Sequence, residues 1–589
     1  MRQTAKQIAA NASFQAFMNS YLKELGQEEW YRKDEVHFPC PSGINGEELL
    51  YVRLPKQKQE LILEVAYRSL VGRHTFSRVF HRADTTWREQ DFYTTVVLLI
   101  QELHMEEIKY VGSYDDSHCD ELLVRFLESY QNMAHYIEKR LGEHKHRVHS
   151  FIEGEQSLVY GHWLHPTPKS KQGMASWQHS TYAPELRGTF QLHYFKVHMN
   201  LIKEDSALGM SARTIVQQNI MSEIQLRENE IVIPMHPLQA QWLLQQSYVQ
   251  DAMQKGDILH LGPLGSCYTA TSSIRTLYQE NSKWMYKFSI PVKVTNSLRT
   301  NRLHELKAGV AMARLIQTLQ YDTASFRIIQ DPAYLTVNLL GEKESGFEVI
   351  IRSNPFQQGH DQGIFTIAAL VQDPLPGRIS NIRQIIESLT LQENRSVQEV
   401  SRKWLQHYFT CAIEPLLRLY DTHGIALEAH QQNSILDVSR GYPTVYYYRD
   451  NQGYYLSRSY QAYLQEKEPS LEPDLFYEDT IIQERFAYYL FVNQIFSVLH
   501  RFGVEGLLTE EESVHWLTIS LQELQKDFTG PGKSFLHMLF TQESFPCKAN
   551  LLTRLYDVDE LAADLEQAVY VTIANPFVSR KELHYAHSV

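Results

Sequence analysis

The spacing of apolar residues changes twice along the 589-residue chain and divides it into three parts. In residues 1–150, apolar positions recur every three or four residues in an opening helix and in two later long helices, the last over residues 122–141. Short strands are predicted between these helices, at residues 48–54 and 61–70. The first part is therefore expected to combine helices with a small sheet.

Residues 151–375 carry more strand signals. Alternating or β-branched runs occur in EIVIPMHP, CYTATSSIRTLY, WMYKFSIPVKVTNSLR, YLTVNLL and FEVIIR, and a helix over residues 302–320 interrupts them. From residue 376 onward the pattern is mainly helical, apart from a hairpin-like stretch, NSILDV followed by TVYYYRD. A chain of this length is too long for one hydrophobic core, so we expect an α+β protein with domains at 1–150, 151–375 and 376–589.

Composition and charge narrow the class of function. The chain has 56 Lys and Arg against 69 Asp and Glu, a net charge of −13. This balance argues against a general nucleic-acid binder, which needs a basic face. It suits a cationic substrate such as a polyamine.

The cysteines and the N-terminal residues indicate a reducing environment. Five cysteines lie far apart and form no C-x-x-C pair, which argues against a disulfide framework and a thiolate zinc site. The opening MRQTAKQIAANASFQAFMNSYLK lacks the continuous apolar core of a signal peptide, and no stretch reaches the roughly 18 apolar residues of a membrane span. We expect a cytoplasmic protein.

One segment resembles a nucleotide-binding motif but does not match its full pattern. Gly530-Pro531-Gly532-Lys533-Ser534 resembles the end of a P-loop, but Asp527 stands where the pattern needs its first glycine. No strand is predicted before it, so a surface turn is the better interpretation. If the protein uses ATP, the nucleotide must bind elsewhere.

A first candidate binding segment is GHWLHPTPKSKQG, residues 161–173. Its two prolines and terminal glycine predict a stiff loop, which could hold His165, Lys169 and Lys171 toward one point at low entropic cost. Imidazole and ammonium groups suit a phosphate or a carboxylate. The alternative is an exposed basic loop.

A second candidate is a basic face on two neighbouring strands. Five residues have odd numbers and, with regular period-two alternation, would share one face: Ser273, Arg275, Lys287, Thr295 and Arg299. Phe288, Ile290, Val292 and Val294 would then face the core. The face would carry three cations, two hydroxyl groups and no acid. It therefore suits an anion with several oxygens better than it suits plain solvation.

The third candidate is the segment His423–Asp450, which contains EAHQQNSIL and YYYRD. Glu428 and Asn433 are five residues apart, and Asp450 follows after the hairpin-like stretch. This spacing is similar to that of a kinase catalytic loop followed by its metal-holding Asp. Because Mg²⁺ prefers hard oxygen ligands, a carboxylate, an amide oxygen and substrate phosphates could hold it here. Taken singly, Glu428 or Asn433 could equally be a helix cap or a surface residue.

Together these segments carry a family resemblance. HPTPKSKQG, MHPLQAQW, TSSIRTL, KFSIPVKVTNSLRTN, EAHQQNSIL, YYYRDNQG, CKANLLTR and ANPF occur in this order from about residue 150 to the C-terminus. In these motifs the chain resembles the siderophore synthetases that work without a nonribosomal peptide synthetase, the aerobactin-synthetase-like (IucA/IucC) family. The N-terminal AKQIA and the run EGEQSLVYGHWLHPTPKSKQG favour the branch that joins citrate to spermidine.

The resemblance implies a fold, a reaction and a set of site residues. The fold would be a cupped hand, with a thumb at 1–150, fingers at 151–375 and a palm at 376–589, usually in a homodimer. ATP and Mg²⁺ would be used to adenylate citrate, and an amine would then take the acyl group. Matched by motif, the ATP contacts would be His165, Ser273, Arg275, Lys287, Gln432 and Asn433. The Mg²⁺ ligands would be Glu428 and Asp450, and the carboxylate would meet His165, Thr295, Arg299 and His430.

Among these residues, Arg275, Lys287, Arg299 and His430 would carry the catalysis. Lys169, Lys171 and Lys548 are further candidates, and the sequence offers no clear base for the amine proton. Two other functions stay open: a kinase-like phosphotransferase that releases ADP, and a noncatalytic binder of citrate or of a ferric siderophore. Within the ligase class, the acid could also be 2-oxoglutarate or a substituted citrate. The amine could be replaced by a hydroxylamine-bearing diamine, an amino acid or an alcohol.

Overall fold

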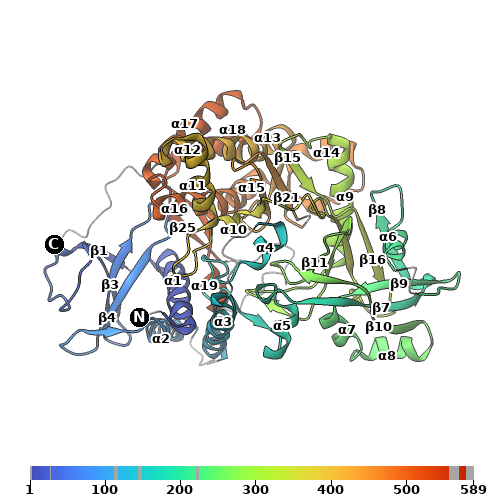
Figure 1. Cartoon of the computed structure of the whole chain (residues 1–589), viewed down its shortest axis with the longest axis horizontal. Helices are drawn as coiled ribbons and strands as arrows, with labels where there is room; N and C mark the ends of the chain where they lie inside the picture. Colours follow the sequence, from blue (N-terminus) through green and yellow to red (C-terminus); the bar gives the residue numbers. More distant parts are fainter. Residues whose placement is uncertain are drawn as a thin grey trace.

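A computed structural model describes residues 3–26, 28–111, 117–142, 149–220, 224–450, 452–555 and 569–578. Three parts of the chain can be followed in Figure 1. The first part begins with helix α1 (Ala5–Leu25), whose N-terminus is closed by a capping box between Thr4 and Gln7. A five-stranded antiparallel sheet follows in chain order: β1 (Glu28–Arg32), β2 (Glu48–Leu54), β3 (Gln59–Tyr67), β4 (Thr75–Arg82) and β5 (Arg88–Gln90). Helices α2 (Phe92–Val111) and α3 (Ser117–Leu141) pack on α1.

The second part is built on an eight-stranded antiparallel sheet, drawn in green in Figure 1. Its order is β8-β16-β17-β12-β11-β10-β7-β9. The strands are β7 (Thr189–His198), β8 (Ile202–Ser206), β9 (Glu230–Met235), β10 (Ile258–Ala270), β11 (Thr276–Tyr278), β12 (Trp284–Phe288), β16 (Ala333–Val337) and β17 (Val349–Ser353). Helix α9 (Leu303–Leu319) packs against β16. Inward side chains of this sheet form one buried apolar core.

The third part is mainly helical and lies at the top of Figure 1. Its principal helices are α11 (Asn381–Glu393), α12 (Val397–Tyr408), α13 (Glu414–His423), α15 (Asp479–Phe486), α16 (Phe496–Val504), α17 (Glu510–Asp527) and α18 (Pro531–Thr541). Two π-helical stretches, η5 (Phe409–Ile413) and η8 (Ala487–Ile495), continue α12 and α15. The same core holds two small sheets, β15-β21-β20-β18 and β19-β22-β23.

Strands from distant segments join the second and third parts. In the four-stranded sheet, β15 (Phe326–Ile329) pairs with β21 (Val445–Arg449), and β18 (Ile364–Thr366) pairs with β20 (Ser434–Asp437). Near the other end of the chain, α19 (Asn550–Leu555) packs against α1 and α3. These joints bring the turn after β21 and the segment before α19 to the same central region.

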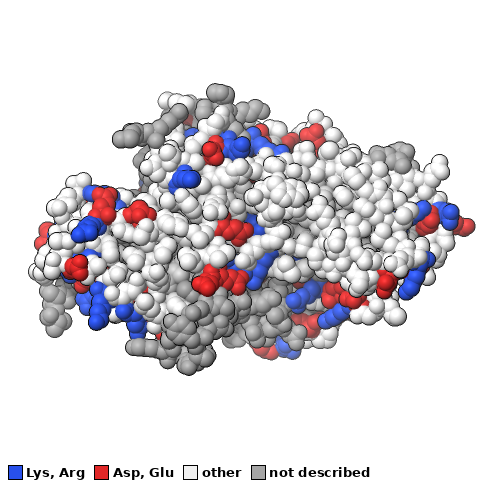
Figure 2. Space-filling view, turned by 90° about the horizontal axis from the view of Figure 1, so that it is seen from below, with Lys and Arg blue, Asp and Glu red and all other residues white. Residues whose placement is uncertain are grey.

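The predicted α+β class, the central antiparallel sheet and the mainly helical C-terminal half are confirmed. The helices expected at 122–141 and 302–320 correspond to α3 and α9, and the expected hairpin corresponds to the antiparallel pair β20 and β21. The strand expected at 61–70 is β3, which begins and ends slightly earlier. Among the described residues, no helix is long and apolar enough to cross a membrane. On the face in Figure 2, the described acidic and basic side chains are interspersed.

The segment that resembles a P-loop forms the start of helix α18, and a protein carboxylate caps that helix. Helix α17 precedes it, and α18 starts at Pro531, so the expected surface turn is in fact a first helical turn. The carboxylate of Asp421 accepts the amides of Thr529, Gly530 and Lys533 at 3.1, 2.9 and 3.2 Å. A Cβ on Gly530 would lie 2.0 Å from the Asp421 carbonyl oxygen, so glycine is required there. Asp421 thus occupies the position that a phosphate would take in a P-loop.

Replacing Asp421 should destabilise this helix end. Asp421→Ala leaves three amides without their acceptor, and we expect a loss of about 2 kcal/mol. The thermal unfolding midpoint should fall, and the amides of Gly530 and Lys533 should exchange with solvent faster. Glu523→Ala is the control, because its ion pair with Lys526 is largely exposed and contributes little. Wild-type melting and exchange in Asp421→Ala would show that the carboxylate does not stabilise α18.

Candidate functional site

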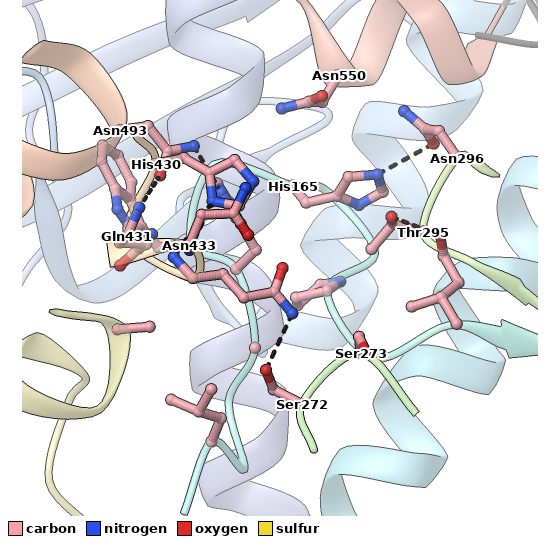
Figure 3. Close-up of a pocket in the computed structure, with 18 of the residues that line it drawn as sticks. His165, Ser272, Ser273, Thr295, Asn296, His430, Gln431, Asn433, Asn493 and Asn550 are labelled. Carbon is pink, nitrogen blue, oxygen red and sulfur yellow. Dashed lines mark hydrogen bonds between the residues drawn. The ribbon is translucent and has the colours of Figure 1, made fainter. Parts of the chain in front are cut away.

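A cavity of about 740 Å³ lies among the eight-stranded sheet, the helical part and the segment before α19. Its lining combines residues that are more than 100 positions apart in sequence, and Figure 3 shows several of them turned toward one another. Every site residue predicted from the sequence lines it: His165, Lys169, Lys171, Ser273, Arg275, Lys287, Thr295, Arg299, Glu428, His430, Gln432, Asn433, Asp450 and Lys548. The predicted residues therefore share one cavity, although several of their contacts differ from those expected.

The basic face is built from turns as well as strands. Lys287 lies on β12, opposite Thr276 of β11, but Ser273 and Arg275 belong to the turn between β10 and β11. In that turn Ile274 has φ 67° and a fully buried side chain. The prediction of two continuous strands with one basic face is therefore wrong, because the turn, and not period-two alternation, directs Arg275 into the cavity.

A second turn carries the other two residues of that face. Thr295, with φ 55°, follows β13 (Lys293–Val294), and Arg299 follows β14 (Ser297–Leu298). Val294 packs against the core as expected, but it is only partly buried and also lines the cavity. Phe288, Ile290 and Val292 are fully buried in the core, as expected.

The basic face has acidic partners that the sequence did not reveal. Lys287 Nζ lies 2.9 Å from Asp450 Oδ1, which directly joins β12 to the turn after β21. Arg352 forms a two-pronged ion pair with Asp331, at 2.6 and 2.8 Å, and its Nη2 lies 3.6 Å from Asp450. Burial alone would raise the pKa of Asp450, but Lys287 and Arg352 outweigh it and hold that pKa well below its usual range.

Hydrogen bonds fix the orientation of Arg275. Its Nη1 donates to the carbonyl of Thr300 and to Asn301 Oδ1, both at 3.0 Å. Its Nη2 donates to Gln452 Oε1 at 3.1 Å, which ties the turn before β11 to the segment after β21. Gln452 in turn donates to Glu305 of α9 at 2.9 Å. A guanidinium held from three sides in this way presents its charge in a fixed direction.

The loop between β19 (Ile425–Leu427) and β20 supplies oxygen and nitrogen groups from the opposite wall. Glu428 Oε1 accepts from the Tyr455 hydroxyl at 3.1 Å. A Cβ on Gly453 would lie 2.6 Å from Glu428 Cβ, so glycine is needed beside the carboxylate. Asn433 Nδ2 donates to the Glu428 carbonyl at 3.2 Å. Gln432 Nε2 donates to Ser272 Oγ at 3.0 Å, which bridges to the turn that carries Ser273 and Arg275.

The donor set of this wall fits Mg²⁺ bound together with phosphates. Glu428, Asn433 and Asp450 offer the hard oxygen ligands that Mg²⁺ prefers. Within the part of the chain that the structure describes, no three His, Cys, Asp or Glu side chains are grouped to hold a metal ion. Mg²⁺ commonly takes one or two carboxylates and completes its shell with water and substrate oxygens. The residues present match that mode of binding.

His430 is a neutral hydrogen-bond donor in this environment. Its Nδ1 accepts the amides of Gln432 and Asn433, each at 3.3 Å, which places the ring proton on Nε2. Burial lowers the pKa of His430 to about 4. The ring therefore presents an N–H without a positive charge at neutral pH.

In the loop of residues 161–173, His165, Lys169 and Lys171 are buried, so the alternative of an exposed basic loop is wrong. His165 Nδ1 accepts the amide of Thr167 at 3.1 Å, and its Nε2 meets Asn296 Oδ1 at 3.0 Å (Figure 3). Lys169 and Lys171 instead converge on Glu185, at 2.6 and 2.7 Å. The expectation that all three side chains converge on one bound anion is wrong for the lysines, since their anion is a protein carboxylate.

Several lining residues had no signal in the sequence pattern. Asn493, on η8, accepts the amide of Gln431 at 3.3 Å and positions the 428–433 loop. Glu155 accepts the Ser272 amide at 2.8 Å and pairs with Arg449 at 2.8 Å. Asn296, next to Thr295, could have been inferred from its neighbour. The others act through partners more than 60 positions away.

Comparisons with known proteins agree with this architecture. The IucA / IucC family model matches residues 150–372, and the model described as ferric iron reductase FhuF-like transporter matches residues 402–563. A spermidine-citrate ligase from Bacillus anthracis is 40% identical, with 98% of each chain covered. The rhizobactin siderophore biosynthesis protein RhbC from Rhizobium meliloti is 33% identical, over 74% of this chain and 77% of that protein.

A solved structure supports the same grouping. The ATP-bound aerobactin synthetase IucA from Klebsiella pneumoniae superposes with a TM-score of 0.86 at 25% identity, covering 97% of this chain and all of that one. A relative 40% identical along nearly the whole chain is sufficient to assign the family. The chain belongs to the IucA/IucC family of siderophore synthetases.

Proposed function

We propose that the protein is an ATP- and Mg²⁺-dependent ligase that adenylates citrate and transfers the citryl group to a polyamine such as spermidine. The observation that carries the proposal is the cavity in which Arg275 and Lys287 face Glu428 and Asp450, with Lys287 and Asp450 in contact at 2.9 Å. Cations on one wall and a carboxylate-amide loop on the other suit a nucleotide triphosphate with Mg²⁺. Similarity to a spermidine-citrate ligase and to an ATP-bound aerobactin synthetase supports this substrate class.

Each wall of the cavity has a role in this proposal. The nucleotide contacts are His165, Ser273, Arg275, Lys287, Gln432 and Asn433. Glu428 and Asp450 would hold Mg²⁺, which supplies positive charge to the phosphates when it is bound. The acid contacts are His165, Thr295, Arg299 and His430. The resemblance also leads us to propose a homodimer.

The first chemical step overcomes the low reactivity of a carboxylate. One citrate carboxylate oxygen attacks the α-phosphorus of ATP, a P–O bond forms, and pyrophosphate leaves with the electron pair of the broken bond. Negative charge grows on the phosphate oxygens, where Arg275 and Lys287 stabilise it. Arg299 and His430 hold the other carboxylates and keep citrate from turning.

The second step forms the amide. A free alkyl amine has a pKa of about 10.4, so it must lose a proton before its nitrogen attacks the acyl carbon. The C–N bond forms, and AMP leaves with the electron pair of the acyl–oxygen bond. The buried walls keep water from competing for the activated acyl group.

Loss of a charged side chain from either wall should greatly lower the rate of the first step. Arg275→Ala and Asp450→Ala are each expected to lower citrate-dependent pyrophosphate release at least about 10²-fold. Arg227→Ala is the matched control, because Arg227 is exposed and lies outside the cavity. Near-normal rates in both cavity variants, with the control also normal, would place the nucleotide elsewhere.

The products decide between reaction classes. With ATP, citrate and spermidine, we expect AMP, pyrophosphate and a citryl-spermidine amide, identified by nucleotide chromatography and mass spectrometry. ADP in place of AMP would support the phosphotransferase alternative. Turnover only with another acid or amine from a substrate matrix would replace the substrates and keep the reaction class.

The neutral state of His430 predicts a particular pH dependence. Because its pKa is lowered to about 4, the ring gains a proton only below that pH, and its N–H contact with the acid is constant at higher pH. The ratio of kcat/KM for citrate between wild type and His430→Ala should therefore stay constant from pH 5.5 to pH 8. A ratio that rises as the pH falls through 6.5 would show that the ring binds the acid as a cation.

A further inference from the structure

Three tyrosines from the mainly helical third part form an aromatic wall of the cavity. Tyr455 lies on β22 (Tyr454–Ser457), Tyr477 on β23 (Phe476–Tyr477), and Tyr489 on the π-helix η8. The ring centroids of Tyr455 and Tyr477 are 5.5 Å apart, and those of Tyr455 and Tyr489 are 6.4 Å apart. All three rings line the cavity, and we call them the tyrosine wall.

The tyrosine wall adjoins the residues assigned to the acid and to the metal. The Tyr489 ring lies 6.1 Å from the ring of His430, and the Tyr455 hydroxyl donates to Glu428 Oε1 at 3.1 Å. A molecule on this wall is therefore next to an acid held by His430. This is the place from which a nucleophile would approach the activated acyl group.

The backbone of η8 is unusual, and it serves the cavity. A π-helical stretch inside an α-helix is rare and frequently marks a functional site. All nine residues of η8 are buried, and Tyr488, Tyr489 and Asn493 line the cavity. Asn493 accepts the amide of Gln431, so the element that presents Tyr489 also supports the 428–433 loop.

The chemistry of the tyrosine wall differs from that of the rest of the cavity. The cavity wall that comes from the second part of the chain presents Arg275, Lys287 and Arg299, which attract anions and repel protonated amines. A ring face is negative at its centre and attracts an alkylammonium group. Arg485 also lines the cavity, but its guanidinium group lies over the ring of Tyr570, 4.0 Å from the ring centroid.

We propose that the tyrosine wall binds the ammonium group of the polyamine that is not acylated, and so selects diamines and polyamines over monoamines. The inference rests on the proposed function, because it assumes an amine acceptor. The reacting nitrogen must be neutral, whereas the distal nitrogen stays protonated at neutral pH and keeps its charge for the ring faces. The methylene chain between the two nitrogens packs on the same aromatic surface.

Amine selectivity tests the proposal. The measured quantity is kcat/KM for spermidine divided by kcat/KM for propylamine, which lacks the second ammonium. Tyr477→Leu should lower this ratio about 10-fold, since it removes a ring face and keeps apolar bulk. Tyr477→Phe should retain the ratio within about 2-fold, because phenylalanine keeps the ring. Tyr463→Leu is the control, since Tyr463 lies on α14 (Gln461–Lys467) outside the cavity.

A second measurement tests the proposed function separately from the role of the tyrosine wall. Hydroxylamine traps an acyl adenylate without any polyamine, so it reports the first step alone. If wild type forms no trapped product with citrate, the proposed function fails whatever the tyrosines do. If trapping is normal and the selectivity ratio is unchanged in Tyr477→Leu, the tyrosine wall does not bind the amine. Should Tyr477→Leu not fold, Tyr489→Leu and Tyr489→Phe provide the same comparison.

Discussion

The contact between Lys287 and Asp450 is the interaction on which the site depends. It joins the eight-stranded sheet to the helical part at 2.9 Å, and Arg352 with its own partner Asp331 stands behind it. A buried ammonium or carboxylate without a partner would cost several kcal/mol, so each wall of the cavity needs the other. Under the proposed function, phosphates and Mg²⁺ bring both charge signs at once. The nucleotide could then satisfy Lys287 and Asp450 together while leaving neither buried charge unpaired.

The candidate site could be found from the sequence because its residues lie in short segments of unusual composition. The segments 271–276 and 428–433 each concentrate polar groups within a few positions, and both line the cavity. Their geometry could not be found in the same way. Period-two alternation requires an unbroken strand, whereas Ile274 at φ 67° turns the chain before Arg275. Likewise, the sequence predicts that Lys169 and Lys171 bind an anionic ligand, because no local pattern indicates Glu185 as their partner.

Most of the α+β fold followed from apolar periodicity, since β3, α3, α9 and the β20–β21 hairpin have strong local patterns. The joints between the parts did not. The pairing of β15 with β21 is parallel and spans more than 100 residues, so no local pattern specifies it. Backbone strain is a further feature that periodicity misses. Ile274, Thr295 and Asp450 have φ of 67°, 55° and 128°, and Thr295 and Asp450 line the cavity. Strain of this kind persists where surrounding contacts enforce it, which is common at functional sites.

Under the proposed function, the cavity accepts a polyanion and a polycation at adjacent positions, and His430 lies where the two regions meet. An imidazolium there would strengthen the grip on the acid, but it would repel an ammonium on the neighbouring Tyr489. Burial resolves the conflict by lowering the pKa of His430 to about 4, so the ring donates a hydrogen bond without a charge. The loop amides of Gln432 and Asn433 fix the proton on the nitrogen that can reach a ligand. In this proposal the same loop orients the acid and keeps the amine region free of positive charge from this ring, so its anchoring by Asn493 and Ser272 would matter to both substrates.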